Sequence, residues 1–594
     1  MWYGDKLSYS IESFFARLSL LKYFIYFFIG LIFLRLVFLQ VIKGDQYRKR
    51  ADDNRVVVYP QPATRGKIYD KNLDVIVDNK PSFVVLFSRQ MLADSEVNNI
   101  IKQVSGMLAI PSEKLFEKLA SAEVKNFTLI KLAENITKYQ AMRLSEKIPQ
   151  LPGIMVRVEP VRTYKWKNIA AHLTGYIQSA TVDDLSKIPG LNSSSFIGKT
   201  GIEKQYDTEL RGYDGGMLIE VTARGVQKKI LGITEPQDGL SLVLTVDKGV
   251  QKALAENMEG YTGCAIAIDP NSGGILGLVS SPGYEPNSFI NGIEDWRMSY
   301  FLNSKSRPLL NRALQCHYPP GSIFKMITAT AGLENSLITP KDVVNCKGYI
   351  EIGKYNQRFR CWLKEGHGNI RLVDAITNSC DVYFYDVGLK LGPAKLNEWS
   401  KKFMLGEVTG VDLPYEVKGL IPDKSWKKSR LNQMWYDGDT VNMSVGQGYI
   451  LVTPIQVAQY IATIANGGTI FQTHVLRKII DANGNMVSEN IPRIRSQLKI
   501  DPANIKVIKT GMLNAVRYGT ARAAFLPELS IAGKTGTAQN PHGKNHAWFV
   551  CFAPYEKPKI ALVVMVEHGG GGGEVAAPLA GKMLDEMFYG GFFE

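Results

Sequence analysis

The sequence predicts a multidomain α+β protein that is held to a membrane by one N-terminal helix. Twenty almost wholly apolar residues run from Tyr23 to Ile42, and residues 43–239 then mix strand-like runs with amphipathic helices. The texture changes near Gly239, and the chain closes with three strand-like runs. We therefore expect an N-terminal tail (1–22), a transmembrane helix (23–42), a mixed α/β region (43–239) and a larger domain (240–594) that also contains strands and helices.

The bulk composition is that of a folded protein with more than one core. The chain has 594 residues, of which 45% are hydrophobic and 21% charged, so it is long enough for several domains and is not a disordered chain. The net charge of +14 is spread along the sequence, and no zinc-finger or RNP-like signature accompanies it. We expect no nucleic-acid partner.

The apolar segment YFIYFFIGLIFLRLVFLQVI has the length of a membrane span, since about twenty helical residues cross a bilayer core. The following KGDQYRKR contains no small-residue cleavage site, which predicts an uncleaved anchor. Basic residues flank the span on both sides and more of them follow it, so the positive-inside rule alone would place the long domain in the cytoplasm. Long domains can override that rule.

Two further features of the N-terminal segment carry hypotheses. Arg35 interrupts the span, and it either snorkels to the interface or pairs with an acidic residue of another membrane protein. Upstream, apolar residues at helical spacing predict an amphipathic helix lying on the membrane surface. These residues are Ile11, Phe14, Phe15 and Leu18.

Periodicity predicts the main elements of the two large regions. Amphipathic helices are expected at Ser95 to Leu108, Ser112 to Ala122 and Lys138 to Ile148. Two apolar runs around Asp-Pro-Asn-Ser-Gly-Gly predict a hairpin from Gly263 to Pro282. Near the C-terminus three successive strands are expected, in SIAGKTGTAQ, HAWFVCFAP and KIALVVMVE.

The letters GKTG occur twice, at residues 198–201 and 533–536. A phosphate-binding P-loop needs a glycine five residues before the Gly-Lys pair, but Ser193 and Glu528 stand there. Neither copy is therefore a Walker loop. The second copy lies on a predicted strand, whereas the first leads into the helix-like IEKQYDTEL.

The stretch HYPPGSIFKMITATAGLEN has the pattern of a nucleophile at a helix start. Pro319 and Pro320 exclude a helix upstream, and an apolar helix can begin at Ser322. Ser322 and Lys325 then share one helical face. A serine hydroxyl needs a base, and lysine serves as one only when it is uncharged, a state favoured by burial or a nearby cation. Taken alone, S-x-x-K is more often an ordinary helix N-cap.

Two later motifs change this interpretation. Ser379-Cys380-Asp381 follows the S-x-x-K helix, and Lys534-Thr535-Gly536-Thr537 follows on a strand. The order S-x-x-K, S-x-[ND], K-T-G is the signature of penicillin-binding proteins and serine β-lactamases. Further matching motifs are Arg65 to Asp70, His172 to Tyr176, Tyr318 to Lys325, and Gly446 to Gly448 before Thr453-Pro454.

On these motifs the chain resembles the class B penicillin-binding proteins, and it is most similar to the penicillin-binding protein 2 branch of the rod-shape elongation machinery. The resemblance implies a penicillin-binding/β-lactamase-like transpeptidase domain at 240–594, with an antiparallel sheet flanked by helices, and a non-catalytic, dimerisation-type pedestal with a head subdomain at 43–239. It places the first GKTG in that pedestal. It also implies a single-pass inner-membrane protein with a cytoplasmic tail (1–22) and its catalytic domain in the periplasm.

The same resemblance implies the activity, a peptidoglycan D,D-transpeptidase or D-Ala-D-Ala carboxypeptidase that β-lactams inhibit covalently. Ser322 would attack the penultimate D-Ala of a murein stem peptide, Lys325 would be its base, and Ser379 would relay protons. The strand residues Lys534, Thr535, Gly536 and Thr537 would bind the substrate, with the N–H groups of Ser322 and Thr537 as the oxyanion hole. Asp381 stands where Asn is more common, and Asp suits the elongation-type subgroup better than the septal one.

Partners and rival functions follow from the same comparison. The resemblance implies a RodA-type glycan polymerase in the membrane and an MreC-type scaffold at the pedestal. The alternatives are a septal-type relative, a β-lactamase or β-lactam sensor, and a non-catalytic scaffold that activates a polymerase. The absence of an E-x-x-L-N motif between Asp381 and Lys534 argues against a β-lactamase, and the intact motifs argue against a scaffold as the sole role.

Four soft ligands form a candidate metal site with the spacing C-x14-C-x5-H-x12-C: Cys346, Cys361, His367 and Cys380. Such a set can make a closed tetrahedral zinc site. The alternative is a disulfide between Cys346 and Cys361 in an oxidising periplasm. The resemblance favours structural zinc, because elongation-type relatives bind it with Asp, His and Cys residues at matching places, and cysteines replace two of those acids here.

Overall fold

The structure is a computed structural model that describes residues 5–594 except 46, 48–55, 89–91, 122–128, 190, 192–194, 222–226, 291, 292 and 354. The chain divides into two compact units. The first comprises residues 1–62, 82–159 and 214–237, and the second comprises 63–81, 160–213 and 238–594. The domain boundary that the sequence predicts near Gly239 stays a prediction, because segments of the two compact units alternate along the chain.

The N-terminal helix α1 (Asp5–Val37) continues into a π-helical turn, η1 (Phe38–Ile42). Within it, residues Leu21–Ile42 have a mean hydropathy of 2.4 and none of this stretch is buried. One exposed, apolar helix of this length fits a single-pass membrane anchor. The predicted tail helix is part of α1, although the side chains of Ile11, Phe14 and Phe15 lie outside the described residues. Arg35 lies over the Phe38 ring, 5.5 Å from its centroid.

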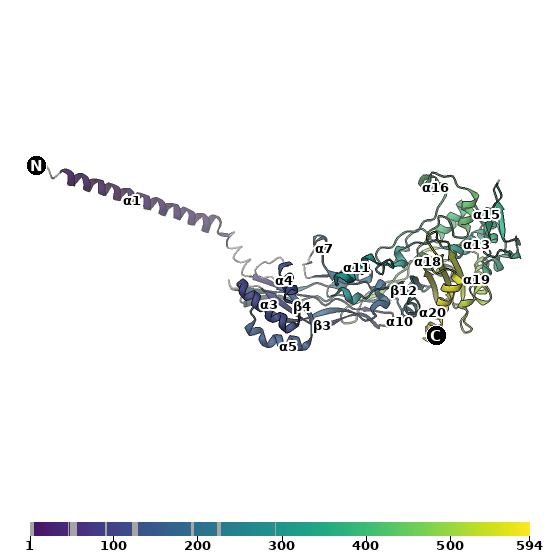
Figure 1. The fold of residues 1–594 in the computed structure, drawn as a ribbon, viewed down its shortest axis with the longest axis horizontal. Coiled ribbons are helices and arrows are strands. Elements are labelled where there is room, and N and C mark those ends of the chain that lie inside the picture. The colour runs from purple at the N-terminus through teal and green to yellow at the C-terminus, as the bar shows by residue number, and fades with distance from the viewer. Residues whose placement is uncertain are drawn as a thin grey trace. The chain divides into compact units, whose positions relative to one another are not determined.

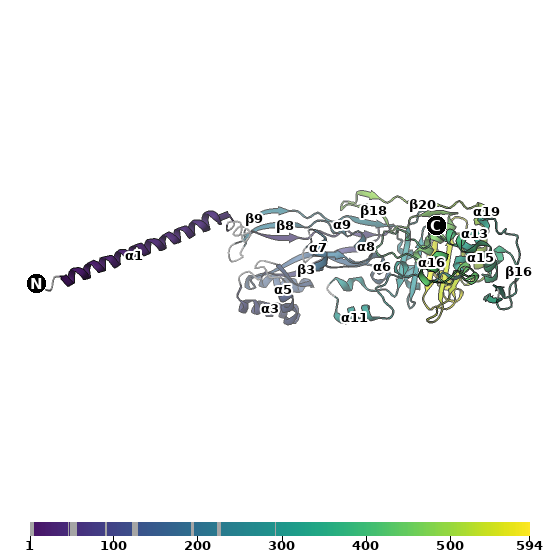
Figure 2. The same cartoon turned by 90° about the horizontal axis from the view of Figure 1, so that it is seen from above.

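The first unit contains the three predicted amphipathic helices, whose limits agree with the prediction to within one residue. They are α3 (Asp94–Leu108), α4 (Ser112–Ser121) and α5 (Lys138–Lys147). Their apolar faces share a core with β4 (Leu129–Ile136) and the second half of β3 (Val75–Ser88). A separate antiparallel sheet has the order β1 (Val56–Gln61), β8 (Gly215–Val221), β9 (Gln227–Thr234), and Figure 2 shows β8 beside β9.

The second unit is built on a five-stranded antiparallel sheet with the order β12-β11-β23-β22-β21. The predicted hairpin is β11 (Gly263–Ile268) and β12 (Ile275–Ser281). The three predicted C-terminal strands are β21 (Ala532–Ala538), β22 (His546–Ala553) and β23 (Ile560–Val566). These predictions are confirmed.

Both faces of this sheet are buried by helices. Alternate residues of β23 belong to two different cores, because successive strand side chains point to opposite faces. Helix α18 (Pro454–Ala465) covers one face, and α10 (Lys248–Asn257) and α20 (Ala577–Tyr589) cover the other (Figure 1). Burial on both sides explains why β23 reads as an uninterrupted apolar run rather than an alternating one.

Part of the predicted pedestal packs within the second unit. Strand β2 (Ile68–Tyr69) pairs in parallel with β10 (Ser241–Leu244), which follows the predicted boundary near Gly239. The first GKTG copy lies between β7 (Phe196–Gly198) and helix α8 (Gly201–Gln205), where Gly201 has a positive φ of 58°. That copy is a strand-to-helix turn, and α8 carries the buried Glu203.

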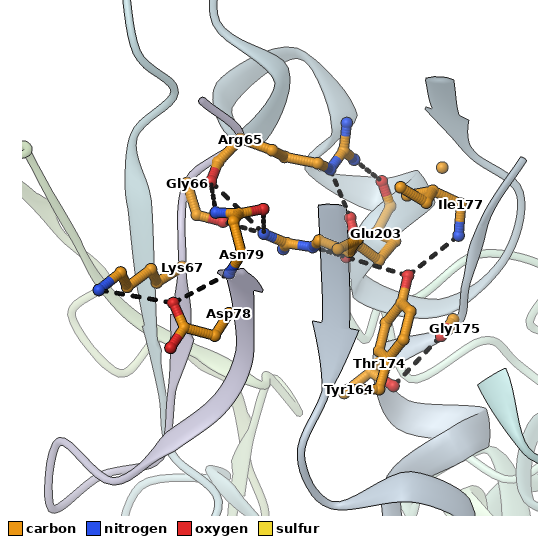
Figure 3. A network of polar contacts seen from close by, with 12 residues as sticks. Arg65, Gly66, Lys67, Asp78, Asn79, Tyr164, Thr174, Gly175, Ile177 and Glu203 are labelled. Carbon is orange, nitrogen blue, oxygen red and sulfur yellow. Dashed lines mark hydrogen bonds and ion pairs between the residues drawn. The ribbon is translucent and has the colours of Figure 1, made fainter. Parts of the chain in front are cut away.

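Glu203 is the centre of a buried charge network in this unit (Figure 3). Its two carboxylate oxygens accept hydrogen bonds from Arg65 Nε and Arg162 Nε, each at 2.7 Å. Arg65 also donates to Asp207 at 2.8 Å, and Arg162 donates to the Gly66 carbonyl at 2.6 Å. The two arginines lower the pKa of Glu203 although burial opposes this. Charges this deeply buried are tolerated because each is paired and hydrogen-bonded.

Candidate active site

The segment that carries Ser322 begins as a tight turn. Residues Gly321–Phe324 form a 3₁₀-helix, η5, which continues into α13 (Lys325–Glu334). The sequence predicted a helix from Ser322; the structure adds that its first turn is 3₁₀, closed by the N–H of Lys325 on the carbonyl of Ser322. Gly321 has a positive φ of 58° and its N–H donates to the Gly446 carbonyl at 2.9 Å. Ser322 is half-buried at this turn.

Lys325 is fully buried and joins two of the predicted motifs. Its ammonium donates to the Ser379 carbonyl at 2.8 Å, to Ser379 Oγ at 3.2 Å and to Asp381 Oδ1 at 2.7 Å. Ser379 lies in the left-handed region with a φ of 55°, in the short link between α14 (Leu372–Thr377) and α15 (Asp381–Lys402). A serine in that region is strained by about 1–3 kcal/mol, and such strain collects at functional sites.

These three acceptors match the three N–H donors of an ammonium group. The described hydrogen bonds of Lys325 do not include Ser322 Oγ. The resting arrangement therefore differs from the simplest form of the sequence hypothesis, an uncharged amine already bonded to the serine. Lys325 has to exchange a partner and hold a free lone pair before it can take the Ser322 proton.

The second GKTG copy forms the middle of β21, directly against η5. A Cβ added at Gly536 would lie 3.0 Å from the Pro320 carbonyl oxygen, and one at Gly321 would lie 2.8 Å from the Thr537 carbonyl oxygen. Only glycines allow the two backbones to come this close. The strand residue that follows, Thr537, is exposed, so it borders the same turn as Ser322 and remains open to solvent.

Lys534 is fully buried on β21, with Nζ donating to the Thr535 carbonyl at 3.0 Å. Burial, and then the nearby positive charge of Lys325, lower the pKa of Lys534 well below its ordinary value, while Asp381 opposes this. Thr535 is buried and its hydroxyl donates to Thr520 Oγ1 at 3.1 Å. The structure thus brings the S-x-x-K, S-x-D and K-T-G motifs around one point, as the sequence predicted.

Two residues that hold Thr537 were not assigned a role from the sequence. Gln447 Nε2 donates to the Thr537 carbonyl at 3.2 Å, and the Gly572 N–H donates to Thr537 Oγ1 at 3.2 Å. Gln447 belongs to the Gly446 to Gly448 motif that carried the resemblance, so its position was signalled. Gly572 lies in the glycine run from Gly569 to Gly573, outside those motifs.

Trp362 and Glu567 also contact residues in or beside the predicted motifs, and sequence reasoning missed both. The Trp362 N–H donates to Asp381 Oδ2 at 2.9 Å, and its indole N–H donates to the Asn378 carbonyl at 3.0 Å. Tyr318, four residues before Ser322, donates its hydroxyl to Glu567 Oε1 at 2.6 Å. Neither pairing has a local sequence signature, because its partners lie on separate elements.

The four candidate metal ligands converge as predicted. The ligand atoms of Cys346, Cys361, His367 and Cys380 all lie within 4.8 Å of one another. His367 Nδ1 is 3.6 Å from the sulfur of Cys346 and 3.6 Å from that of Cys361. A hydrogen bond from Cys380 lowers the pKa of Cys361 to about 5, which favours a thiolate. All six cysteines of the chain are free thiols in this structure.

Chemically, this arrangement suits acyl transfer. A hydroxyl on a tight helical turn lies one turn from a buried lysine, a second serine shares that lysine, and a strand with a basic group faces the turn. Nucleophile, base, proton relay and anion-binding strand are the parts that serine acylation needs.

Comparisons with known protein families agree with this geometry. Residues 263–585 match the penicillin binding protein transpeptidase domain, and residues 60–244 match the penicillin-binding protein dimerisation domain.

Named relatives extend over almost the whole chain. The peptidoglycan D,D-transpeptidase MrdA of Acinetobacter baumannii is 34% identical over 94% of this chain and 87% of its own length. The protein of the same name from Escherichia coli K12 is 30% identical over 94% of this chain and 92% of its own length.

Solved structures show the same fold. Penicillin-binding protein 2 of Helicobacter pylori in complex with MreC is similar with a TM-score of 0.81 and 32% identity, covering 91% of this chain and 99% of that one. A chain of a peptidoglycan synthase complex that coordinates polymerisation and crosslinking is similar with a TM-score of 0.72 and 28% identity, covering 96% and 98%. The chain belongs to the penicillin-binding protein family, as an elongation-type peptidoglycan D,D-transpeptidase of the penicillin-binding protein 2 branch.

Proposed function

We propose that Ser322 is the acylated nucleophile of this transpeptidase and that Lys325, Ser379 and Lys534 serve it. The contact of Lys325 with both Ser379 and Asp381, beside the β21 strand, is the observation that supports this assignment. In the first step Ser322 Oγ attacks the carbonyl carbon of the penultimate D-Ala while its proton passes to the uncharged amine of Lys325. The backbone N–H groups of Ser322 and Thr537 stabilise the oxyanion.

Collapse of this intermediate breaks the peptide C–N bond, and Ser379 relays the proton that Lys325 took from Ser322 to the leaving D-Ala nitrogen, which leaves Lys325 uncharged again. Lys534, Thr535 and Thr537 hold the terminal carboxylate through charge-assisted hydrogen bonds, with Gly536 allowing close approach. In the second step an amine of another stem peptide attacks the ester carbon. The amine loses its proton through Ser379 to Lys325, Lys325 passes that proton to Ser322 Oγ as the ester C–O bond breaks, and the new amide is the crosslink. Attack by water instead gives the carboxypeptidase side reaction.

Crosslinking by the purified full chain tests this assignment. With glycan strands that carry stem peptides, wild type should form crosslinked dimers and release D-Ala in equal amounts. Ser322→Ala should form none, while Thr510→Ala, a substitution of a half-buried threonine on α19 (Pro502–Arg517), should retain activity. Crosslinking by Ser322→Ala would overturn the assignment.

We further propose that the catalytic unit lies in the periplasm of a Gram-negative inner membrane and works with a RodA-type polymerase and an MreC-type scaffold. The similarity to a penicillin-binding protein 2 in complex with MreC and to a peptidoglycan synthase complex supports these partners. Alkaline phosphatase fused after residue 594 should be active, and green fluorescent protein at the same place should be dark. The reverse result would place the domain in the cytoplasm.

Arg35 offers a test of the membrane partner. Snorkelling predicts that Arg35→Glu still co-purifies with the polymerase, whereas a pairing with an acidic residue predicts loss of the complex. Arg35→Lys, which keeps the charge, is the matched control.

We propose structural zinc at Cys346, Cys361, His367 and Cys380. Zinc–sulfur bonds of about 2.3 Å and zinc–nitrogen bonds of about 2.0–2.1 Å at tetrahedral angles put nitrogen and sulfur about 3.6 Å apart. The observed Nδ1–sulfur separations of 3.6 Å fit that requirement. Bound there, zinc would join the segment from Cys346 to His367 to Cys380, inside the Ser379 motif, and would supply no chemistry to the reaction.

A further inference from the structure

The surface beside the S-x-D motif carries an aromatic residue that is exposed yet rigidly held. Trp362 is 57% exposed, and both of its N–H groups are hydrogen-bonded to the catalytic segment, one to Asp381 and one to Asn378. The edge of its ring contacts His367, with the centroids 5.7 Å apart. A large ring that is already ordered and still faces solvent binds a ligand at low cost in conformational entropy.

The segment around Trp362 adds further exposed rings and a basic surface. In the hairpin of β14 (Tyr349–Ile352) and β15 (Gln357–Arg360), Tyr355 is 96% exposed and Tyr349 is 36% exposed. Among the described residues 346–353 and 355–371, five exposed basic side chains stand against two exposed acidic ones, Glu351 and Glu365. The basic ones are Lys347, Arg358, Arg360, Lys364 and Arg371. Such a surface complements an anionic ligand with apolar faces.

This surface is hydrogen-bonded to the Ser379 side of the proposed catalytic residues. Trp362 bonds to the segment that contains Ser379, whereas the groups assigned to the donor carboxylate lie on β21. In the proposed mechanism, on which this inference rests, Ser379 handles the proton of the attacking amine. The second stem peptide therefore has reason to approach over the Ser379 side.

We propose that the described residues 346–353 and 355–371, with Trp362 as the central contact, bind the acceptor stem peptide, the one whose amine attacks the acyl-enzyme. Trp362 packs against the peptide's apolar surface, and the exposed basic residues attract its carboxylates. The surface fixes the amine near the ester, so it favours the formation of the new amide over attack by water. It contributes nothing to the acylation of Ser322.

The partition of the acyl-enzyme tests this directly. The full-length protein is acylated with a peptide ending in D-Ala-D-Ala, and a stem peptide with a free amine is supplied at concentrations below its KM. Trp362→Ala should lower the ratio of amide product to hydrolysed product about three- to tenfold, through a higher KM for the acceptor. Acylation by fluorescent penicillin should change less than twofold, and Trp362→Phe should recover most of the ratio.

The chain offers a matched control in Trp296, which is 64% exposed and donates its indole N–H to Glu294 at 2.9 Å. Trp296→Ala should leave the ratio unchanged. Lys364→Glu and Arg360→Glu, two exposed substitutions that avoid the Trp362 contacts, should also raise the acceptor KM, and added salt should reduce the difference from wild type.

The proposal would be overturned if Trp362→Ala left the ratio of amide product to hydrolysed product unchanged. It would also be overturned if this ratio and the rate of acylation by penicillin fell together in both Trp362→Ala and Trp362→Phe. A wild-type protein that penicillin fails to acylate would instead refute the assigned nucleophile. The two failures are thus distinguishable.

Discussion

The carboxylate of Asp381 joins the catalytic lysine to the neighbouring surface segment: Oδ1 lies 2.7 Å from Lys325 Nζ, and Oδ2 accepts the Trp362 N–H at 2.9 Å. One side chain therefore sets the position of Lys325 and of the 346–371 segment together. An asparagine at this place has one oxygen and one amide nitrogen, so it can accept only one of these two hydrogen bonds through its oxygen.

Substitutions of Asp381 should lower the free energy of unfolding and the acylation rate, and the loss should be larger when more of its hydrogen bonds are removed. Asp381→Ala leaves the buried Lys325 without its anionic partner, and it should lower the free energy of unfolding by about 3 kcal/mol and slow acylation by penicillin at least tenfold. Asp381→Asn keeps one acceptor and should lose less on both counts. Urea denaturation measures the free energy of unfolding, and time-resolved labelling with fluorescent penicillin measures the acylation rate. If Asp381→Ala matched wild type in both quantities, the ion pair would be contradicted.

Lys534 should make the protein less stable than it would be with an apolar side chain. Because burial and Lys325 lower its pKa in the folded state, the unfolded chain binds more protons between that lowered pKa and the ordinary value of 10.5. The free energy of unfolding should therefore rise with pH through this window, and Lys534 should cost stability as the pH falls. Lys534→Met should be more stable than wild type at pH 7 and should flatten this rise, while acylation is lost.

The control for that experiment is Lys509, which is partly buried and contacts the Ala465 carbonyl at 2.9 Å. Lys509→Met should retain acylation. If Lys534→Met proves less stable than wild type at pH 7 with an unchanged pH dependence, the side chain is stably charged in its site.

The Glu203 network should be a major source of stability for the second unit. Glu203→Gln leaves Arg65 and Arg162 buried without a shared anion, so the free energy of unfolding should fall by about 3–5 kcal/mol. The exposed pair of Lys187 and Asp183, 2.7 Å apart, is the matched control, and Asp183→Asn should cost less than about 1 kcal/mol. Similar losses from both substitutions would show that burial does not decide the effect.

Metal removal should affect folding more than chemistry. Metal analysis of protein purified without chelator should give one zinc per chain, and chelation should lower Tm. Cys361→Ser should reduce the zinc content, whereas Cys551→Ser, at a buried cysteine outside the cluster, should not. If the protein contains no zinc and a reducing agent lowers its Tm, the result would instead support the Cys346 to Cys361 disulfide.

Local patterns predicted the local structure well. The helices α3, α4 and α5 and the strands β21 to β23 were found because their periodicity or uninterrupted apolar character is set by one or two buried faces. The meeting of Lys325, Ser379 and Asp381 was predicted from motif order, which carries information that periodicity lacks.

Pairings between distant segments that no motif connects were not predicted. The contacts of Tyr318 with Glu567 and of Trp362 with Asp381 depend on how elements pack, and no residue near either partner signals the other. The interleaved compact units were missed for the same reason, since the parallel pairing of β2 with β10 joins residues far apart in the chain. The 3₁₀ start of the Ser322 helix follows from its close packing on β21, which the Pro-Pro-Gly sequence alone does not specify.

The central claim is that Ser322 forms the acyl-enzyme. Mass spectrometry of the intact protein and of its peptides after incubation with labelled penicillin measures this most directly. Wild type should gain the mass of one penicillin on the peptide that contains Ser322, and Ser322→Ala should gain none while keeping its Tm. An adduct on another residue, or one that persists in Ser322→Ala, would contradict the account.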